Sequence, residues 1–162
     1  MVLNSTNIAL LIWGVVFCNL AGLPGGIYTL MRYTSWYALL KKPSFHPQIW
    51  VFGAAWTVLY TLIGVSLYIL YKHGLSQPKV VNAAFDLVLM FVLNSIWPMM
   101  FLGFQSFISG LVAISILWII TVVTIYHFAL VSSIAALFLI PYLLWISFLA
   151  VLNLSLWELN KS

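Results

Sequence analysis

From Leu87 to Trp157 the chain carries no Asp, Glu, Lys or Arg. As one continuous helix this stretch would be about 106 Å long at ~1.5 Å per residue, whereas the hydrocarbon core of a bilayer is only ~30 Å thick. The stretch must therefore cross a membrane more than once. The rest of the composition agrees, since 5% of the 162 residues are charged and 65% are hydrophobic, against about 25% charged residues in soluble domains.

Five hydrophobic segments have roughly the ~20 residues that a membrane-spanning helix needs. We expect an all-α integral membrane protein, a five-helix bundle forming one domain over residues 1–162, because strands of a membrane barrel would be shorter and would alternate. The predicted spans are residues 8–31, 48–71, 80–101, 109–128 and 134–156, with a long first loop at 32–47. Pro24-Gly25-Gly26 predicts a kink or early break in the first span, and Pro141 predicts a bend in the fifth.

The few basic residues lie at segment ends, where they indicate topology rather than a nucleic-acid site. They are Arg32, Lys41, Lys42 and Lys161 on one side and Lys72 and Lys79 on the other. Because cytoplasmic loops carry the excess of Lys and Arg, we expect the first loop and the C-terminus to face the cytoplasm. We expect a bacterial cell membrane, or the mitochondrial outer membrane in a eukaryote.

One face of the third span combines polar and aromatic residues at helical spacing. These residues are Asp86, Met90, Asn94, Trp97 and Phe101. An ionisable group in a span usually faces the bundle interior or a cavity, but Asp86 lies near a helix end and could instead reach the headgroups. Asn94 is placed either to bond a neighbouring helix or to bond a ligand.

Two further rows share helical spacing and large aromatic side chains. They are Gly53, Trp56, Tyr60 and Gly64 in the second span, and Pro141, Trp145 and Leu149 in the fifth. Small residues in such a row let helices approach closely, and the aromatic residues either fill the space between helices or line a flat cavity. Both interpretations remain open from the spacing alone.

The titratable residues form no recognisable catalytic or metal-binding pattern. Asp86 and Glu158 lie in different segments, and His46, His73 and His127 lie in three separate regions without metal-ligand spacing. The single cysteine, Cys18, excludes an intrachain disulfide. What remains is a bundle whose inward faces offer Trp, Tyr, Phe and Asn, a lining that suits a large, flat, mostly apolar ligand.

Four motifs in this order resemble those of the translocator protein (TspO/MBR) family, also called tryptophan-rich sensory proteins or peripheral benzodiazepine receptors. They are Trp36-Tyr37-x-x-Leu40-x-Lys42-Pro43, Pro47-x-x-Trp50-x-Phe52-x-x-x-Trp56-x-x-Leu59-Tyr60, Asn94-x-x-Trp97-Pro98-x-x-Phe101 and Pro141-Tyr142-x-x-Trp145-x-x-Phe148-Leu149-Ala150-x-Leu152-Asn153. Together they extend over residues 34–153. Any one of them alone would be weak, but the ordered set is specific.

The resemblance implies a pocket between five helices, capped by the first loop, in a protein that is commonly a homodimer surrounded by membrane lipid. Family ligands are porphyrins such as protoporphyrin IX, sterols such as cholesterol, and benzodiazepine-type drugs; no cofactor is required, porphyrin being a ligand. The family's ligand-binding residues correspond here to Tyr37, Pro47, Trp56, Asn94, Trp97, Phe101, Trp145 and Leu149. We expect a porphyrin-binding membrane receptor or transporter-like protein.

Two alternatives remain. One is a light-dependent porphyrin-degrading enzyme, in which the resemblance would assign the reactive tryptophans to Trp56 and Trp145. The other is a regulatory membrane subunit without a ligand, whose aromatic residues only pack. The chain departs from the family at His46-Pro47, where many members have Pro-Pro, and this substitution is expected to alter how the first loop closes. Val65-x-x-Tyr68-x-x-x-Lys72 also fits a proposed sterol pattern.

Overall fold

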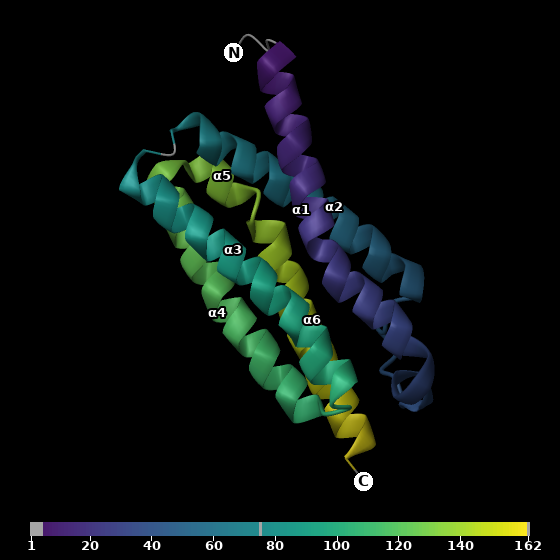
Figure 1. Ribbon diagram of the computed structural model, residues 1–162. Helices are drawn as coiled ribbons and strands as arrows, with labels where there is room; N and C mark the ends of the chain where they lie inside the picture. Colours follow the sequence, from purple (N-terminus) through teal and green to yellow (C-terminus); the bar gives the residue numbers. More distant parts are fainter. Residues whose placement is uncertain (1–4, 75, 162) are drawn as a thin grey trace.

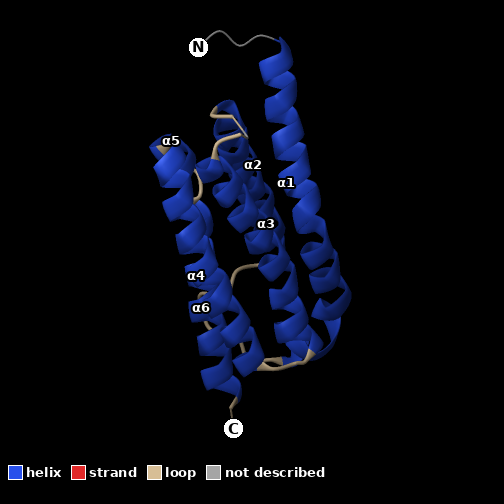
Figure 2. Ribbon diagram, turned by 60° about the vertical axis from the view of Figure 1, so that its left-hand side comes forward, coloured by secondary structure: helices blue, strands red, loops and turns tan. Residues whose placement is uncertain are grey.

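The computed structural model describes residues 5–74 and 76–161, and this described part is helical without a strand (Figures 1 and 2). Its elements are α1 (Ser5–Arg32), a π-helical turn (Tyr33–Tyr37), α2 (Ile49–Lys72), α3 (Pro78–Pro98), a second π-helical turn (Met99–Gly103), α4 (Phe107–Val131), α5 (Ser133–Leu137) and α6 (Ile140–Asn160). Residues 38–48 connect the first π-helical turn to α2 and form, with that turn, the first loop.

Within the described residues, five helical segments are long and apolar enough to cross a membrane. They are Ser5–Arg32, Ile49–Lys72, Pro78–Gly103, Phe107–Val131 and Ser133–Asn160. Each contains or closely overlaps one predicted span, which confirms the five-helix bundle. The chain is a multi-pass integral membrane protein.

The predicted early break in the first span does not occur, because α1 continues through Pro24 to Arg32. Gly25 explains why the helix stays against its neighbour at this point. A Cβ atom on Gly25 would lie 3.5 Å from the Cα atom of Ser95 and 3.6 Å from the carbonyl oxygen of Asn94. The α1 backbone is therefore packed directly on α3, and neighbouring helices of this kind allow a membrane helix to tolerate proline.

The fifth span is interrupted rather than only bent. The short helix α5 ends at Leu137, and α6 begins at Ile140 with Pro141 in its first turn. Proline has no N–H group to donate to the preceding turn, and its ring clashes with the carbonyl four residues earlier, so it fits best at the start of a helix. The break also places Leu139 in the core, where it is fully buried.

Helices α1 and α2 cross at two glycines. A Cβ atom on Gly64 would lie 2.5 Å from the Cα atom of Val15, and one on Gly14 would lie 3.0 Å from the carbonyl oxygen of Gly64. The predicted close approach therefore occurs at Gly64. Gly53, in the same row, has no atom within 4 Å of such a Cβ, so α2 stands free of close neighbours at this position.

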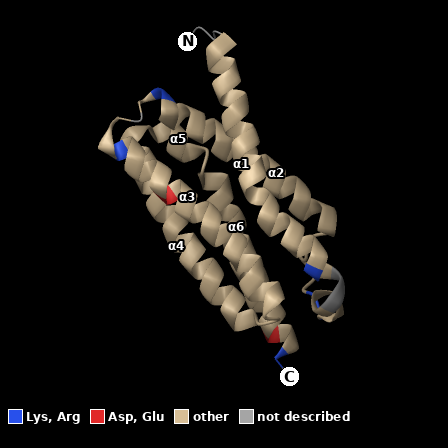
Figure 3. Ribbon diagram, viewed as in Figure 1, with Lys and Arg blue, Asp and Glu red and all other residues tan. Residues whose placement is uncertain are grey.

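The helices form two groups along the bundle. Helices α3, α4 and α6 run beside one another, while α1 and α2 lie together on the other side (Figure 1). The first loop and the end of α6 lie at one end, and the α2–α3 connection lies at the other. Figure 3 shows the Lys and Arg residues gathered at these two ends, as the sequence predicts for interfacial anchors.

Asp86 pairs with a histidine on the neighbouring helix. Its Oδ2 atom contacts Nδ1 of His127 on α4 in a short ion-pair or hydrogen-bond contact. The two side chains are 15% and 31% exposed, respectively. An ionisable residue within a span is costly unless it is paired, so each of these two residues provides the partner that makes the other tolerable.

We expect His127→Leu to destabilise the protein by about 2 kcal/mol, because it leaves the Asp86 carboxylate without its partner in a partly buried position. The double substitution Asp86→Leu and His127→Leu removes both polar groups and is expected to recover most of that loss. Thermal or denaturant unfolding in detergent micelles measures both. If the stability losses of Asp86→Leu and His127→Leu simply add in the double variant, the pairing is contradicted.

Candidate functional site

A cavity of about 660 Å³ lies between α1, α2, α3 and α6, in the half of the bundle nearest the first loop. Its volume falls within the roughly 300–1,000 Å³ of small-molecule sites. Among the described residues, no Asp, Glu, Lys, Arg or His side chain lines it. The lining of the cavity is thus uncharged and mostly apolar.

A chain of hydrogen bonds between three helices forms the inner end of the cavity. The amide nitrogen of Asn94 donates to the hydroxyl oxygen of Tyr60 at 2.6 Å, and the hydroxyl of Tyr142 donates to the amide oxygen of Asn94 at 2.9 Å. All three side chains are at most 6% exposed. Asn94 therefore links α3 to two other helices and also lines the cavity. Its carboxamide has two N–H donors, and the bond to Tyr60 uses one of them.

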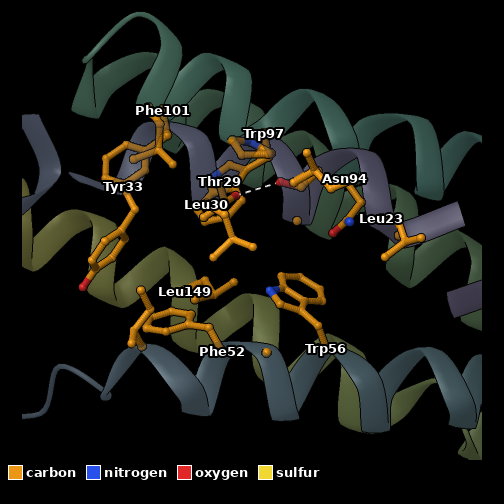
Figure 4. A pocket seen from close by; sticks show the side chains of 18 of the residues that line it. Leu23, Thr29, Leu30, Tyr33, Phe52, Trp56, Asn94, Trp97, Phe101 and Leu149 are labelled. Atoms are coloured by element: carbon orange, nitrogen blue, oxygen red, sulfur yellow. Dashed lines mark hydrogen bonds between the residues drawn. The ribbon is translucent and has the colours of Figure 1, made fainter. Parts of the chain in front are cut away.

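Aromatic side chains form two facing walls. Phe52 and Trp56 of α2 lie across the cavity from Asn94 and Trp97 of α3, as Figure 4 shows. Trp56 stacks on Tyr60 with ring centroids 5.4 Å apart, and Trp97 stacks on Phe101 at 5.9 Å with an interplanar angle of 14°. In each wall the tryptophan stacks on another ring of the same helix or of the turn that follows it. The space between the two walls stays open.

The first loop closes the outer end of the cavity with tyrosines. Tyr33 and Tyr37 line the cavity, and Tyr37 meets the ring of Phe101 edge-on at 5.8 Å. The hydroxyl of Tyr37 is hydrogen-bonded to Nε2 of His46 at 2.8 Å. The ammonium group of Lys42 lies 5.5 Å from the centre of the Tyr37 ring. The first loop is therefore the lid of the cavity. His46, the residue that departs from the family pattern, is hydrogen-bonded directly to Tyr37, a residue of this lid.

The same loop is fastened to the end of α6 by one carboxamide. Asn160 accepts a hydrogen bond from the backbone N–H of Lys41 at 2.9 Å and donates to the backbone carbonyl of Lys41 at 3.0 Å. This reciprocal pair resembles one rung of a strand ladder. It ties the lid to the helix that carries Leu149 and Asn153, two residues of the cavity wall.

Six of the eight predicted ligand-binding residues line the cavity. They are Tyr37, Trp56, Asn94, Trp97, Phe101 and Leu149. The other two lie just outside the lining. Trp145 stands behind Trp56 and Phe52, with ring centroids 6.4 and 5.9 Å away, and Pro47 lies between His46 and the start of α2.

Asn153 and the α1 residues of the wall were not among the residues predicted to bind a ligand. Helix α1 contributes a run that includes Asn19, Gly22, Gly26 and Leu30, but it has no periodic aromatic row that could have indicated this. Asn153 is 1% exposed, and neither its amide nitrogen nor its amide oxygen has a hydrogen-bond partner among the residues that the structure describes. Its position at the end of the fifth-span motif was the available signal.

Fold and cavity together define a class: a five-helix membrane protein with an uncharged, largely aromatic and apolar cavity between its helices, partly open at the side and covered at one end by a loop. Comparison with known proteins specifies the family, since the profile of the TspO/MBR family matches residues 14–158. The chain belongs to this family. It is 40% identical to the Tryptophan-rich protein TspO of Archaeoglobus fulgidus over 95% of this chain and 99% of the relative. It is 32% identical to the Translocator protein of Bos taurus, over 88% and 85%.

The lid is expected to loosen on acidification because of His46. Burial, and secondarily the charge of Lys42, lowers the pKa of His46 below its ordinary value of 6.5. An opened loop would restore that ordinary pKa. The closed loop is therefore favoured fully above about pH 6.5 and loses this advantage as the pH falls through the window between 6.5 and the lowered pKa.

Amide hydrogen exchange of residues 33–48, corrected for the intrinsic effect of pH, measures this loosening. Protection should fall between about pH 7 and pH 5. The variant His46→Phe keeps a ring against Tyr37 and Phe52 without a titrating group, and it should show no such fall. An identical pH profile in the two proteins would exclude His46 as the cause.

Proposed function

We propose that this protein is a membrane receptor or transporter-like protein that binds tetrapyrroles, with protoporphyrin IX as the representative ligand, in the cavity under the first loop. One observation carries the proposal: a cavity of about 660 Å³ whose walls are aromatic and uncharged, closed at one end by a loop. A planar macrocycle of mostly carbon atoms matches such a space in shape and polarity. The names of the relatives, among them translocator and tryptophan-rich sensory proteins, support a role of this kind.

Trp56 and Trp97 are the side chains best placed to contact the faces of the macrocycle. They lie on opposite walls of the cavity (Figure 4), and each is already fixed in orientation by a stacked neighbour. Each aromatic contact of this kind contributes about 0.5–1.5 kcal/mol beyond the burial of area. The remaining amide hydrogen of Asn94 is available to a polar edge of the ligand.

Ionised carboxylates of the ligand would lie toward the lid end. The lining offers them no cation among the described residues, and burying an unpaired carboxylate is costly. The ammonium group of Lys42 lies over the ring of Tyr37 at the rim, and this end of the bundle gathers basic residues (Figure 3). The macrocycle would thus enter with its apolar edge first.

The alternatives differ in how well the geometry supports them. A regulatory subunit without a ligand would have its aromatic residues packed together, which is at odds with an open cavity of this size. Light-dependent oxidation of a bound porphyrin would use Trp56 in the wall with Trp145 in edge contact behind it. A sterol site at Val65–Lys72 is disfavoured, because Tyr68 is 5% exposed and faces the core.

Tryptophan fluorescence of the purified protein should be quenched saturably by protoporphyrin IX. Trp56→Leu removes one stacking surface and should weaken binding by about five- to tenfold. Trp118→Phe is the matched control, since Trp118 lies on α4 outside the cavity and bonds Ser147. Absence of saturable quenching, or equal effects of the two substitutions, would contradict the proposal.

A further inference from the structure

Asn153 is a buried polar side chain on the cavity wall that the fold does not use. It is 1% exposed, and both polar atoms of its carboxamide lack a hydrogen-bond partner in the part of the chain that the structure describes. Burying such a group without partners is unfavourable. The other two carboxamides on the wall each make two hydrogen bonds within the protein: Asn94 bonds Tyr60 and Tyr142, and the amide nitrogen of Asn19 bonds the backbone oxygen of Val15 and the hydroxyl of Thr61.

A glycine on α4 makes the space for this carboxamide. A Cβ atom on Gly110 would lie 2.6 Å from the amide nitrogen of Asn153 and 2.8 Å from Cδ2 of Phe101. Asn153 and Phe101 therefore pack side by side against Gly110, beside the stacked ring of Trp97, and all three of these larger side chains belong to residues that line the cavity. Among the described residues the indole N–H of Trp97 is also buried without a partner, so this region has more than one unused hydrogen-bond donor.

We propose that Asn153 forms a hydrogen-bonding subsite for an uncharged planar group that carries an acceptor and a donor side by side: a primary amide, a lactam or an un-ionised carboxylic acid at the periphery of the ligand. A carboxamide offers N–H and C=O in one plane, and such a group satisfies both at once. An ionised carboxylate fits less well, because it would leave the amide oxygen unpaired and none of the described residues lining the cavity is a cation. This inference rests on the proposed function.

The test compares the diamide of protoporphyrin IX with its dimethyl ester, by quenching of tryptophan fluorescence. The two probes share one ring and lack charge, but the ester has no donor for the amide oxygen of Asn153. The native protein should bind the diamide about tenfold more tightly, and Asn153→Leu should bring the two affinities together. Asn82→Leu is the control and should leave the ratio unchanged, because Asn82 is an exposed residue of α3 outside the cavity lining.

The stability of the ligand-free variant gives a second measurement. Because Asn153 has no bond to lose, Asn153→Leu should raise the Tm of the ligand-free protein or leave it unchanged. Two results would overturn the subsite and leave the proposed function standing. The native protein could bind both probes saturably with equal affinity, or Asn153→Leu could lower the Tm and weaken the binding of both probes equally. No saturable binding of any tetrapyrrole would overturn the proposed function itself.

Discussion

The hydrogen-bonded chain Tyr60–Asn94–Tyr142 is the interaction on which the site depends most. It joins α2, α3 and α6 at the inner end of the cavity. On its far side, fully buried side chains such as Ile63, Met90 and Leu139 form part of the hydrophobic core. On its near side lies the cavity. In an apolar interior a satisfied polar network of this kind fixes one arrangement of helices, since an unpaired member would be costly.

The first loop holds the other end of the cavity by aromatic packing and a few hydrogen bonds. Tyr37 packs on Phe101, and Trp36 packs on Phe101 and Phe107. Asn160 bonds the loop to α6, whereas the hydrogen bond between Tyr37 and His46 lies within the loop itself. These hydrogen bonds lie at the loop end of the bundle, where water competes for them. The inner end is thus held by a buried polar network and the outer end by surface contacts.

Much of this arrangement follows from periodicity. The spacing of Asn94, Trp97 and Phe101 predicts one shared face, and all three line the cavity. The charge-free run from Leu87 predicts repeated crossings, and five spanning helices are found. Proline was a weaker guide, because its effect depends on the neighbouring helix: Pro24 is accommodated beside a glycine packed on α3, whereas Pro141 starts a new helix.

Contacts between residues far apart in sequence could not be predicted from one chain. Asp86 and His127 are 41 positions apart and Lys41 and Asn160 are 119 apart, and no local pattern links either pair. Trp145 shows the complementary limit. Its row on the fifth span indicates the inward face correctly, but Phe52 and Trp56, which line the cavity, lie in edge contact with it, and Trp145 itself is not part of the lining. The spacing of residues predicts the direction in which a side chain points. Whether that side chain reaches the cavity depends on which neighbouring side chains lie in between.

The central claim is that the space between Trp56 and Trp97 is a ligand cavity closed by the first loop. A structure of the protein in a lipid bilayer with protoporphyrin IX added tests it most directly. The account predicts the macrocycle between these two indoles, with Tyr37 and His46 closed over it and its carboxylates toward the lid. A macrocycle bound on the lipid-facing surface, with the cavity filled by rearranged aromatic side chains, would contradict the account.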